Sequence, residues 1–205
     1  MSPRVIDKEA KKQQIMNAAI QVFARNGIVK TKMIDIADTA GIGKGTIYEY
    51  FRSKEEIFVT AFNHLYAGMT DRIEAELASI TDPALKLKLV IEESLRAFFE
   101  EHKDFAGIML EFWAEAIRNN DETTLQSIQL DKIYEHYRTI LSQIINEGIQ
   151  KGVFKTVDTF STSAIIIAAM DGIMLQWILA PEVIDIYKSA EALMNLIMNG
   201  MQVNP

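Results

Sequence analysis

The chain has 205 residues, of which 49% are hydrophobic and 24% charged, a composition that is typical of globular proteins and excludes fibrous, collagen-like and disordered chains. The lack of cysteine excludes disulfide bonds, thiol nucleophiles and thiolate metal sites, and it favours a cytoplasmic protein. The net charge is −7, but residues 1–54 carry ten Lys and Arg against five Asp and Glu, a net +5, whereas residues 55–205 carry a net −12. A basic segment on an acidic chain indicates a nucleic-acid partner.

The first 54 residues are predicted to form three helices. Helical periodicity indicates a first helix over about residues 7–26, which Gly27 would end. Thr31 is expected to cap a short second helix, and Gly41 lies in the turn that follows it. A third short helix is predicted over residues 44–51. We call residues 1–54 the head.

A long fourth helix is predicted to begin at a capping box, Ser53 with Glu56, and to continue to about Ser79. At 1.5 Å per residue it would be about 39 Å long, which is long enough to join the head to a body. Further helices are predicted over about residues 82–102, 104–118, 124–151, 156 or 158–179, and 181–200. The sequence therefore predicts an all-α protein of about nine helices, divided into the head (1–54) and a helical body (55–205).

The second and third helices have the features of a helix-turn-helix DNA reader. Ile47 is expected to hold the third helix from inside the head. Lys44 at the start of that helix can contact a phosphate, and Gly45 allows close approach because it has no side chain. Thr46 and Tyr50 on the outward face can reach base edges.

The segment ARNGIVKTKMIDIADTAGIGKGTIYEYFRSKEEIF resembles the signature of TetR-type transcriptional regulators over about residues 15–62. The resemblance implies a regulator, usually a repressor and not an enzyme, that binds a palindromic operator as a homodimer and responds to a small effector. It also implies phosphate contacts by Lys44, Tyr48 and Lys54, and groove contacts by Thr46 and Tyr50. Thr31 and Lys32 would hold the second helix to the DNA backbone.

Glu49 occupies the variable position of this signature. Its carboxylate can accept a hydrogen bond from cytosine, or it can form an ion pair with Arg52. We prefer the ion pair on sequence grounds.

Two other function classes are alternatives to a DNA reader. Gly41-Ile42-Gly43-Lys44-Gly45 is similar to a phosphate-binding loop, but no strand precedes it, and Gly45 directly follows the lysine where such a loop needs Ser or Thr. An all-helical metal enzyme would need Glu-x-x-His pairs, and none of the three histidines has a Glu three residues earlier. An all-helical enzyme or a ligand-binding protein with a basic head is the remaining alternative, and no cofactor or metal is expected.

Aromatic and methionine residues are concentrated on the predicted helices of the body, and as a set they favour a pocket for an apolar effector. For any single one of them, core packing is the alternative. The candidate pocket residues are Phe98, Phe105, Met109, Phe112, Trp113, Tyr134, Tyr137, Met170, Met174 and Trp177.

The segments LEFWAEAIRNND and AAMDGIMLQW resemble regulators of fatty-acid breakdown that respond to acyl-CoA. Aromatic compounds and cationic drugs are alternative effectors. Arg96 and Arg118 are candidates to meet an anionic head group.

The most apolar segment, residues 164–180, is interrupted by Asp171, Gly172 and Gln176. A membrane span needs ~20 largely apolar residues, so we interpret this segment as a buried helix and expect no membrane partner. Residues 161–179 and 184–198 are expected to form the dimer interface, because they are too apolar all round to be covered by one subunit. Asp171 and Gln176 would anchor a ligand or, as we prefer, form hydrogen bonds across that interface.

Overall fold

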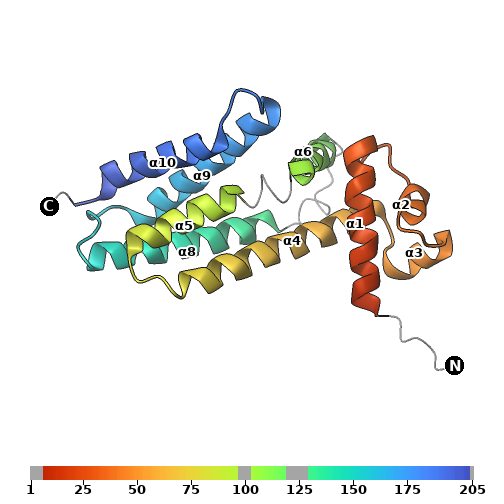
Figure 1. The fold of residues 1–205 in the computed structure, drawn as a ribbon, viewed down its shortest axis with the longest axis horizontal. Coiled ribbons are helices and arrows are strands. Elements are labelled where there is room, and N and C mark those ends of the chain that lie inside the picture. The colour runs from red at the N-terminus through yellow and green to blue at the C-terminus, as the bar shows by residue number, and fades with distance from the viewer. Residues whose placement is uncertain (1–6, 97–102, 119–128, 204–205) are drawn as a thin grey trace. The chain divides into compact units, whose positions relative to one another are not determined.

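The computed structural model describes residues 7–96, 103–118 and 129–203, and these ranges contain nine α-helices and no sheet (Figure 1). The prediction of an all-α fold is confirmed. The described residues form two compact units. We call Met1–Ala67 with Lys103–Ile128 the N-terminal unit, and Gly68–His102 with Gln129–Pro205 the C-terminal unit.

The N-terminal unit contains α1 (Lys8–Asn26), α2 (Met33–Thr39), α3 (Lys44–Tyr50), the first part of α4 (Lys54–Leu77) and α6 (Lys103–Arg118). The three helices of the head lie close to their predicted positions. Asp7 begins α1 as its cap, because its carboxylate accepts hydrogen bonds from the N–H groups of Glu9 and Ala10. Gly27 ends α1 with a φ of +74°, a backbone conformation that favours glycine.

A cluster of phenylalanine rings joins α6 to the head helices. The Phe58 ring on α4 stacks on Phe112 with centroids 4.3 Å apart and on Phe105 at 5.2 Å, and its edge meets Phe23 of α1 at 6.4 Å. Such pairs contribute about 0.5–1.5 kcal/mol each beyond the area that they bury. The compact unit around the head therefore includes a helix that lies beyond residue 54. Whether function divides at residue 54 stays a prediction.

The C-terminal unit contains the rest of α4 with α5 (Pro83–Arg96), α8 (Leu130–Gln150), α9 (Thr159–Leu179) and α10 (Ile186–Met201). Asp158 caps α9, because its carboxylate accepts from the N–H groups of Phe160 and Ser161. α10 begins five residues later than the start predicted at residue 181, because the cap is Asp185, whose carboxylate accepts from the N–H of Lys188.

The core of the C-terminal unit is made by α5, α8, α10 and the segment after α8, with single buried residues from α4 and α9. Leu87, Ile91 and Leu141 are fully buried in it. Gly148 on α8 is in close contact with the Phe154 ring, which would overlap any Cβ at that position. Glycine is therefore required there to make room for the ring.

The chain end is tied to the segment after α8. Phe154 and Gln202 form an isolated antiparallel bridge. The N–H of Lys155 donates to the carbonyl of Met201 at 2.7 Å, and the N–H of Val203 donates to the carbonyl of Val153 at 3.1 Å. These bonds fix the end of α10.

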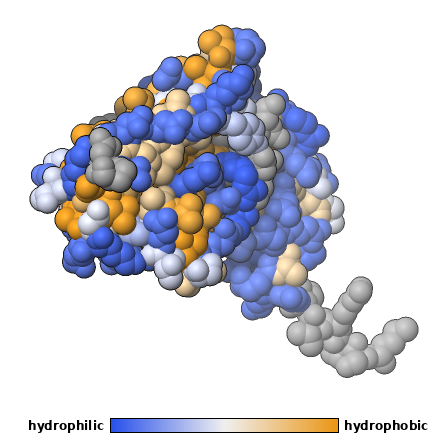
Figure 2. Space-filling view, turned by 60° about the vertical axis from the view of Figure 1, so that its left-hand side comes forward, coloured by the Kyte–Doolittle hydropathy of each residue, from blue (hydrophilic) through white to orange (hydrophobic). Residues whose placement is uncertain are grey.

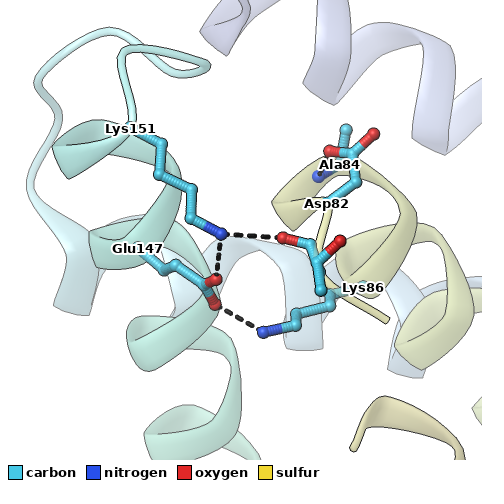
Figure 3. Close-up of polar contacts among 6 residues, drawn as sticks. Asp82, Ala84, Lys86, Glu147 and Lys151 are labelled. Atoms are coloured by element: carbon cyan, nitrogen blue, oxygen red, sulfur yellow. Dashed lines mark hydrogen bonds and ion pairs between the residues drawn. The ribbon is translucent and has the colours of Figure 1, made fainter. Parts of the chain in front are cut away.

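A surface ion network connects α5 to the end of α8 (Figure 3). The Glu147 carboxylate accepts from Lys86 at 2.6 Å and from Lys151 at 2.7 Å, and Lys151 also donates to the carbonyl of Thr81 at 2.8 Å. Hydrogen bonds from Lys151 and Lys86 hold the pKa of Glu147 below its ordinary value. Both lysines are thereby engaged within the protein, and the network orients the start of α5 against α8.

α9 is only partly covered in the single chain. Only Ser163 and Ile166 are buried, whereas Phe160, Ile165 and Leu179 are 63%, 68% and 73% exposed. On α10, Leu196 is 72% exposed. Figure 2, which turns the side of the C-terminal helices forward, shows hydrophobic patches between hydrophilic areas. The prediction that residues 164–180 form a buried helix is therefore wrong for the single chain.

By length and composition, α9 passes the test for a helix that can cross a membrane, with a mean hydropathy of 1.6. Only 11% of that window is buried. A core helix of a soluble protein passes the same test, so this property alone is weak evidence for a membrane.

Candidate functional site

The turn between α2 and α3 has its backbone hydrogen bonds satisfied. Gly41 has a φ of +64° and donates its N–H to the carbonyl of Asp38, and the N–H of Ile42 donates to the carbonyl of Ala37. Gln14 of α1 donates to the carbonyl of Ala40 at 2.6 Å. The two short helices are thus held in a fixed arrangement, as a helix-turn-helix requires.

α3 presents most of its length to solvent. Ile47 is fully buried and Phe51, directly after the helix, is 3% exposed, so these two residues anchor α3 in the head. The other predicted DNA-binding residues of α3 lie outside the core. Lys44, Gly45 and Tyr48 are exposed, and Thr46 and Tyr50 are half-buried. Their contacts with DNA stay predictions.

The start of α2 differs from the prediction that Thr31 caps it. Thr31 is 2% exposed, and its hydroxyl donates to the carbonyl of Gly27 at 2.7 Å. The cap is made by Asp35, whose carboxylate accepts from the N–H of Lys32 at 2.9 Å. The buried hydroxyl of Thr31 therefore fixes the loop after α1, whereas Lys32 is exposed and can approach a phosphate.

Lys54, predicted to contact a phosphate, is engaged inside the head. Its ammonium group donates to the carbonyls of Ile28, Val29 and Thr31 at 2.6, 2.9 and 3.0 Å. An ammonium group has three donors, and all three are used here. A phosphate contact by Lys54 would require one of these hydrogen bonds to break.

The same loop is held from α6 by Glu111. The Glu111 carboxylate accepts from the N–H of Val29 at 3.3 Å, and a Cβ at Gly27 would lie 2.8 Å from one of its oxygens. This contact of Glu111 was not predicted from the sequence. The available signal was its position beside Ile108 and Phe112, which are 4% and 2% exposed and place Glu111 at the edge of the apolar stripe of α6.

The capping box at the start of α4 is shifted by one residue. The Ser53 hydroxyl accepts from the N–H of Glu56 at 3.1 Å, as predicted. The Glu56 carboxylate accepts from the N–H of Arg52 at 2.7 Å, rather than from that of Ser53. The connection between α3 and α4 is therefore fixed by both side chains.

The candidate effector residues are divided between the two compact units. Phe105, Met109 and Phe112 are buried in the N-terminal unit and are 1–2% exposed. In the C-terminal unit the five candidates are half-buried: Tyr134, Tyr137, Met170, Met174 and Trp177. Phe98 lies outside the described residues. Trp113 lies on α6, but its side chain is outside what the structure describes.

Asp171 and Tyr134 form a polar pair between α9 and α8. The Tyr134 hydroxyl donates to the Asp171 carboxylate at 2.9 Å. Burial raises the pKa of Asp171 above its ordinary value, and burial together with the nearby Asp171 charge raises that of Tyr134. Gln176 donates to the carbonyl of Gly172, one turn earlier on the same helix. Asp171 and Gln176, the polar side chains that interrupt the apolar segment, thus both have partners within the chain.

The two arginines considered as anion ligands are paired with acids on their own helices. Arg96 forms an ion pair with Glu93, and Arg118 forms one with Glu115 at 2.7 Å. Within the described ranges, the acidic and histidine side chains form no group of three that could hold a metal ion. Neither arginine is therefore free to meet an anion without giving up its acid.

Models of two protein families match the chain on either side of the loop after α4. Residues 15–61, which include the helix-turn-helix, match the bacterial regulatory proteins of the tetR family. Residues 83–199 match the C-terminal region of BetI-type transcriptional repressors. The chain belongs to the TetR family. It is a DNA-binding transcriptional regulator and not an enzyme.

Relatives and solved structures agree with this assignment. A fatty acid metabolism regulator protein of Bacillus subtilis is 28% identical over 195 residues, which cover 95% of this chain and 97% of that protein. The crystal structure of the regulator FadR from Bacillus subtilis with stearoyl-CoA has a TM-score of 0.78 at 28% identity, with 92% and 98% of the two chains covered. A regulator from Saccharomonospora viridis in complex with choline has a TM-score of 0.83 at 22% identity, with 96% and 100% covered, and it shows the fold alone.

Proposed function

We propose that this TetR-family regulator is a repressor that binds a palindromic operator as a homodimer and is released from it by an apolar or amphipathic effector, an acyl-CoA or a fatty acid. The proposal rests on the exposure of one face of α3. Lys44, Gly45 and Tyr48 are exposed on a helix that Ile47 and Phe51 anchor in a basic head. The proposal has two finer parts, the acyl-CoA effector and the palindromic operator, and each has its own test.

DNA binding by the head follows from charge and shape together. The +5 charge of residues 1–54 attracts phosphates, whereas the −12 charge of the remaining chain repels them. Basic groups of the head would therefore face the duplex, with α3 in the major groove. In a dimer, two copies of α3 would read half-sites ~34–36 Å apart on one face of the duplex.

The uncovered apolar side chains of α9 and α10 support a second copy of the chain as their partner. Residues such as Ile165, Leu179 and Leu196 are 68–73% exposed in the single chain. Contiguous apolar surface of this kind is covered in most soluble proteins. A second copy presents the same apolar surface, so a two-fold interface would cover both.

Sedimentation in dilute solution tests the dimer. We expect a stable dimer without detergent. A stable 23.2 kDa monomer would contradict the dimer. If the protein co-sediments with added lipid vesicles, a membrane covers α9 instead.

An acyl effector is supported by the half-buried side chains of the C-terminal unit. Met170, Met174 and Trp177 offer adaptable apolar contacts. Asp171 and Tyr134 supply a polar pair among these residues. The related FadR structure contains stearoyl-CoA. An effector with a long apolar chain and a polar end fits this combination of side chains.

A titration of effector classes tests this part. Acyl-CoA esters, free fatty acids, aromatic acids and cationic dyes are added to the protein with its operator duplex, while indole fluorescence and DNA affinity are measured. We expect acyl compounds to perturb fluorescence and to lower operator affinity by about 5–150-fold, the usual range of allosteric coupling. Quenching without a change in DNA affinity would refute the coupling, and release by another class would refute the acyl assignment.

A further inference from the structure

Glu49 lies on the exposed face of α3. Ile47 is fully buried, and Glu49, two residues later, is rotated by about 200° around the helix, so the two side chains leave from opposite faces. Gly45 is four residues before Glu49 and lies on the same outward ridge. A Cβ at Gly45 would meet no atom within 4 Å. The ridge therefore offers a carboxylate beside a position that allows close approach of the backbone to DNA.

The carboxylate of Glu49 is unpaired in the described part of the chain. Its ion pair with Arg52, which we preferred on sequence grounds, is not formed in the described part of the chain. The hydrogen bond that Arg52 donates to Glu56 comes from its backbone N–H and does not involve the guanidinium group. Glu49 is exposed, as are Tyr48 and Lys44 on the same helix. Its accepting oxygens are therefore free for an external donor.

The chemistry of duplex DNA restricts which donor that can be. Phosphate oxygens repel a carboxylate, and in the major groove the donors are the amino groups of cytosine and adenine. The adenine amino group lies between two acceptors, its own N7 and the O4 of the paired thymine, and both repel a carboxylate. The cytosine amino group has an acceptor on one side only, the O6 of the paired guanine, so it can be approached by a carboxylate from its other side. We propose that Glu49 accepts a hydrogen bond from the amino group of a cytosine in each operator half-site and so determines the base at that position. This rests on the proposed operator binding.

Selection from a duplex library with 20 randomised base pairs tests the proposal. It is carried out with the full-length wild-type protein and with Glu49→Ala and Glu49→Gln. We expect wild-type sites to contain one defined cytosine in each half, whose replacement lowers affinity by about 5–150-fold. Glu49→Ala should lose this discrimination. Glu49→Gln should prefer adenine, which a Gln side chain contacts through both N6 and N7.

A chemical probe isolates the amino group. In the selected duplex, the cytosine is replaced by 2-pyrimidinone, which lacks only that group. The replacement should weaken the wild type and leave Glu49→Ala unchanged. Asp38→Asn is the matched control, because it also removes one exposed acid from the head. It should change the affinity for all sequences without changing the preferred base.

The outcomes separate this inference from the proposed function. If Glu49→Ala selects the wild-type sequence with unchanged discrimination, Glu49 does not read the base. If it binds every duplex more tightly without a change in preference, the carboxylate only repels the backbone, and the inference is again wrong. If the wild type selects no sequence, the proposed operator binding itself fails. Thermal unfolding of each variant confirms that the head is folded.

Discussion

The head and the two C-terminal helices expose opposite kinds of surface. In the head, the apolar side chains of α1, α2 and α3 are buried against one another, with Ile15, Ile36 and Ile47 fully covered. On α9 and α10, residues such as Ile165 and Leu196 remain exposed. The first region keeps polar and basic groups for its surface, whereas the second leaves apolar groups uncovered.

This difference indicates two kinds of partner. A surface with a complete core beneath it and basic groups above it suits a polyanion, whose contacts are electrostatic and depend on salt. An uncovered apolar surface suits a second protein surface, whose contacts depend on buried area. Substitutions in the head should therefore affect DNA binding, whereas substitutions on α9 and α10 should affect association with a second protein surface.

The largest effect is expected from charges on α9. Ile165→Glu combined with Leu179→Glu places two carboxylates on the apolar surface, so the dimer should dissociate. Operator affinity should fall by more than about 100-fold, because the two heads no longer act together. Sedimentation and operator binding measure both changes. Gln143→Glu, on the exposed face of α8, is the control, and an intact dimer in the double variant would contradict the interface.

The next effect concerns Gly148, where the C-terminal unit is tightly packed. Gly148→Ala places a methyl group in the space of the Phe154 ring and should lower the free energy of unfolding by about 1–3 kcal/mol. Urea denaturation measures it. Gly68→Ala on α4 meets no atom within 4 Å, so it should be neutral or stabilising. Equal effects of the two substitutions would show that helix propensity alone is being measured.

Lys54 should behave as a structural residue of the head. Lys54→Met removes three hydrogen bonds to loop carbonyls and should lower the free energy of unfolding by about 1.5–3 kcal/mol. Chemical denaturation monitored by circular dichroism measures this. A variant with unchanged stability but weaker DNA binding would show that Lys54 serves the phosphate contact that the signature implies.

Lys44 should show the opposite behaviour. Its side chain is exposed at the start of α3, so Lys44→Met should leave the free energy of unfolding nearly unchanged. Loss of one phosphate contact should reduce the slope of log affinity against log salt by about 0.9 per subunit. Operator binding over a series of salt concentrations provides the measurement. An unchanged slope would exclude a phosphate contact by Lys44.

The smallest expected effect concerns Asp171. Because burial raises its pKa, the folded chain favours the protonated acid. The resulting stabilisation is present below the ordinary pKa of 3.8 and is lost as the pH rises through the raised value. Asp171→Asn should therefore be less sensitive to pH between about 4 and 7 than the wild type. Denaturation curves of the wild type and of Asp171→Asn, measured at about pH 4 and at about pH 7, test this. Identical pH dependence of the two proteins would contradict it.

Helix positions in the head could be predicted closely because local signals determine them. Asp7, Gly27 and Ser53 act through neighbouring backbone groups, and each lies at the helix end that the sequence indicated. The side-chain contacts of Lys54 and Glu111 could not be predicted. Lys54 reaches carbonyls 23–26 residues away, and Glu111 reaches an N–H 82 residues away, so no local pattern encodes either contact.

The candidate effector residues were predicted less completely for a related reason. Aromatic and methionine residues occur both in hydrophobic cores and in ligand pockets, so composition does not distinguish a core residue from a pocket residue. Phe105 and Phe112 pack in the N-terminal unit, whereas Met170 and Trp177 lie in the C-terminal unit. Their separation depends on how distant helices pack, which the helical period does not specify.

The bridge between Phe154 and Gln202 holds together the two ends of residues 154–202, the segment that contains α9 and α10. α10 cannot slide along its own axis unless the hydrogen bonds of Lys155 and Val203 break. The register of the exposed apolar side chains on α10 is therefore set by the last described residues of the protein. An affinity tag added after residue 205 should preserve that register, whereas truncation before residue 201 should release it.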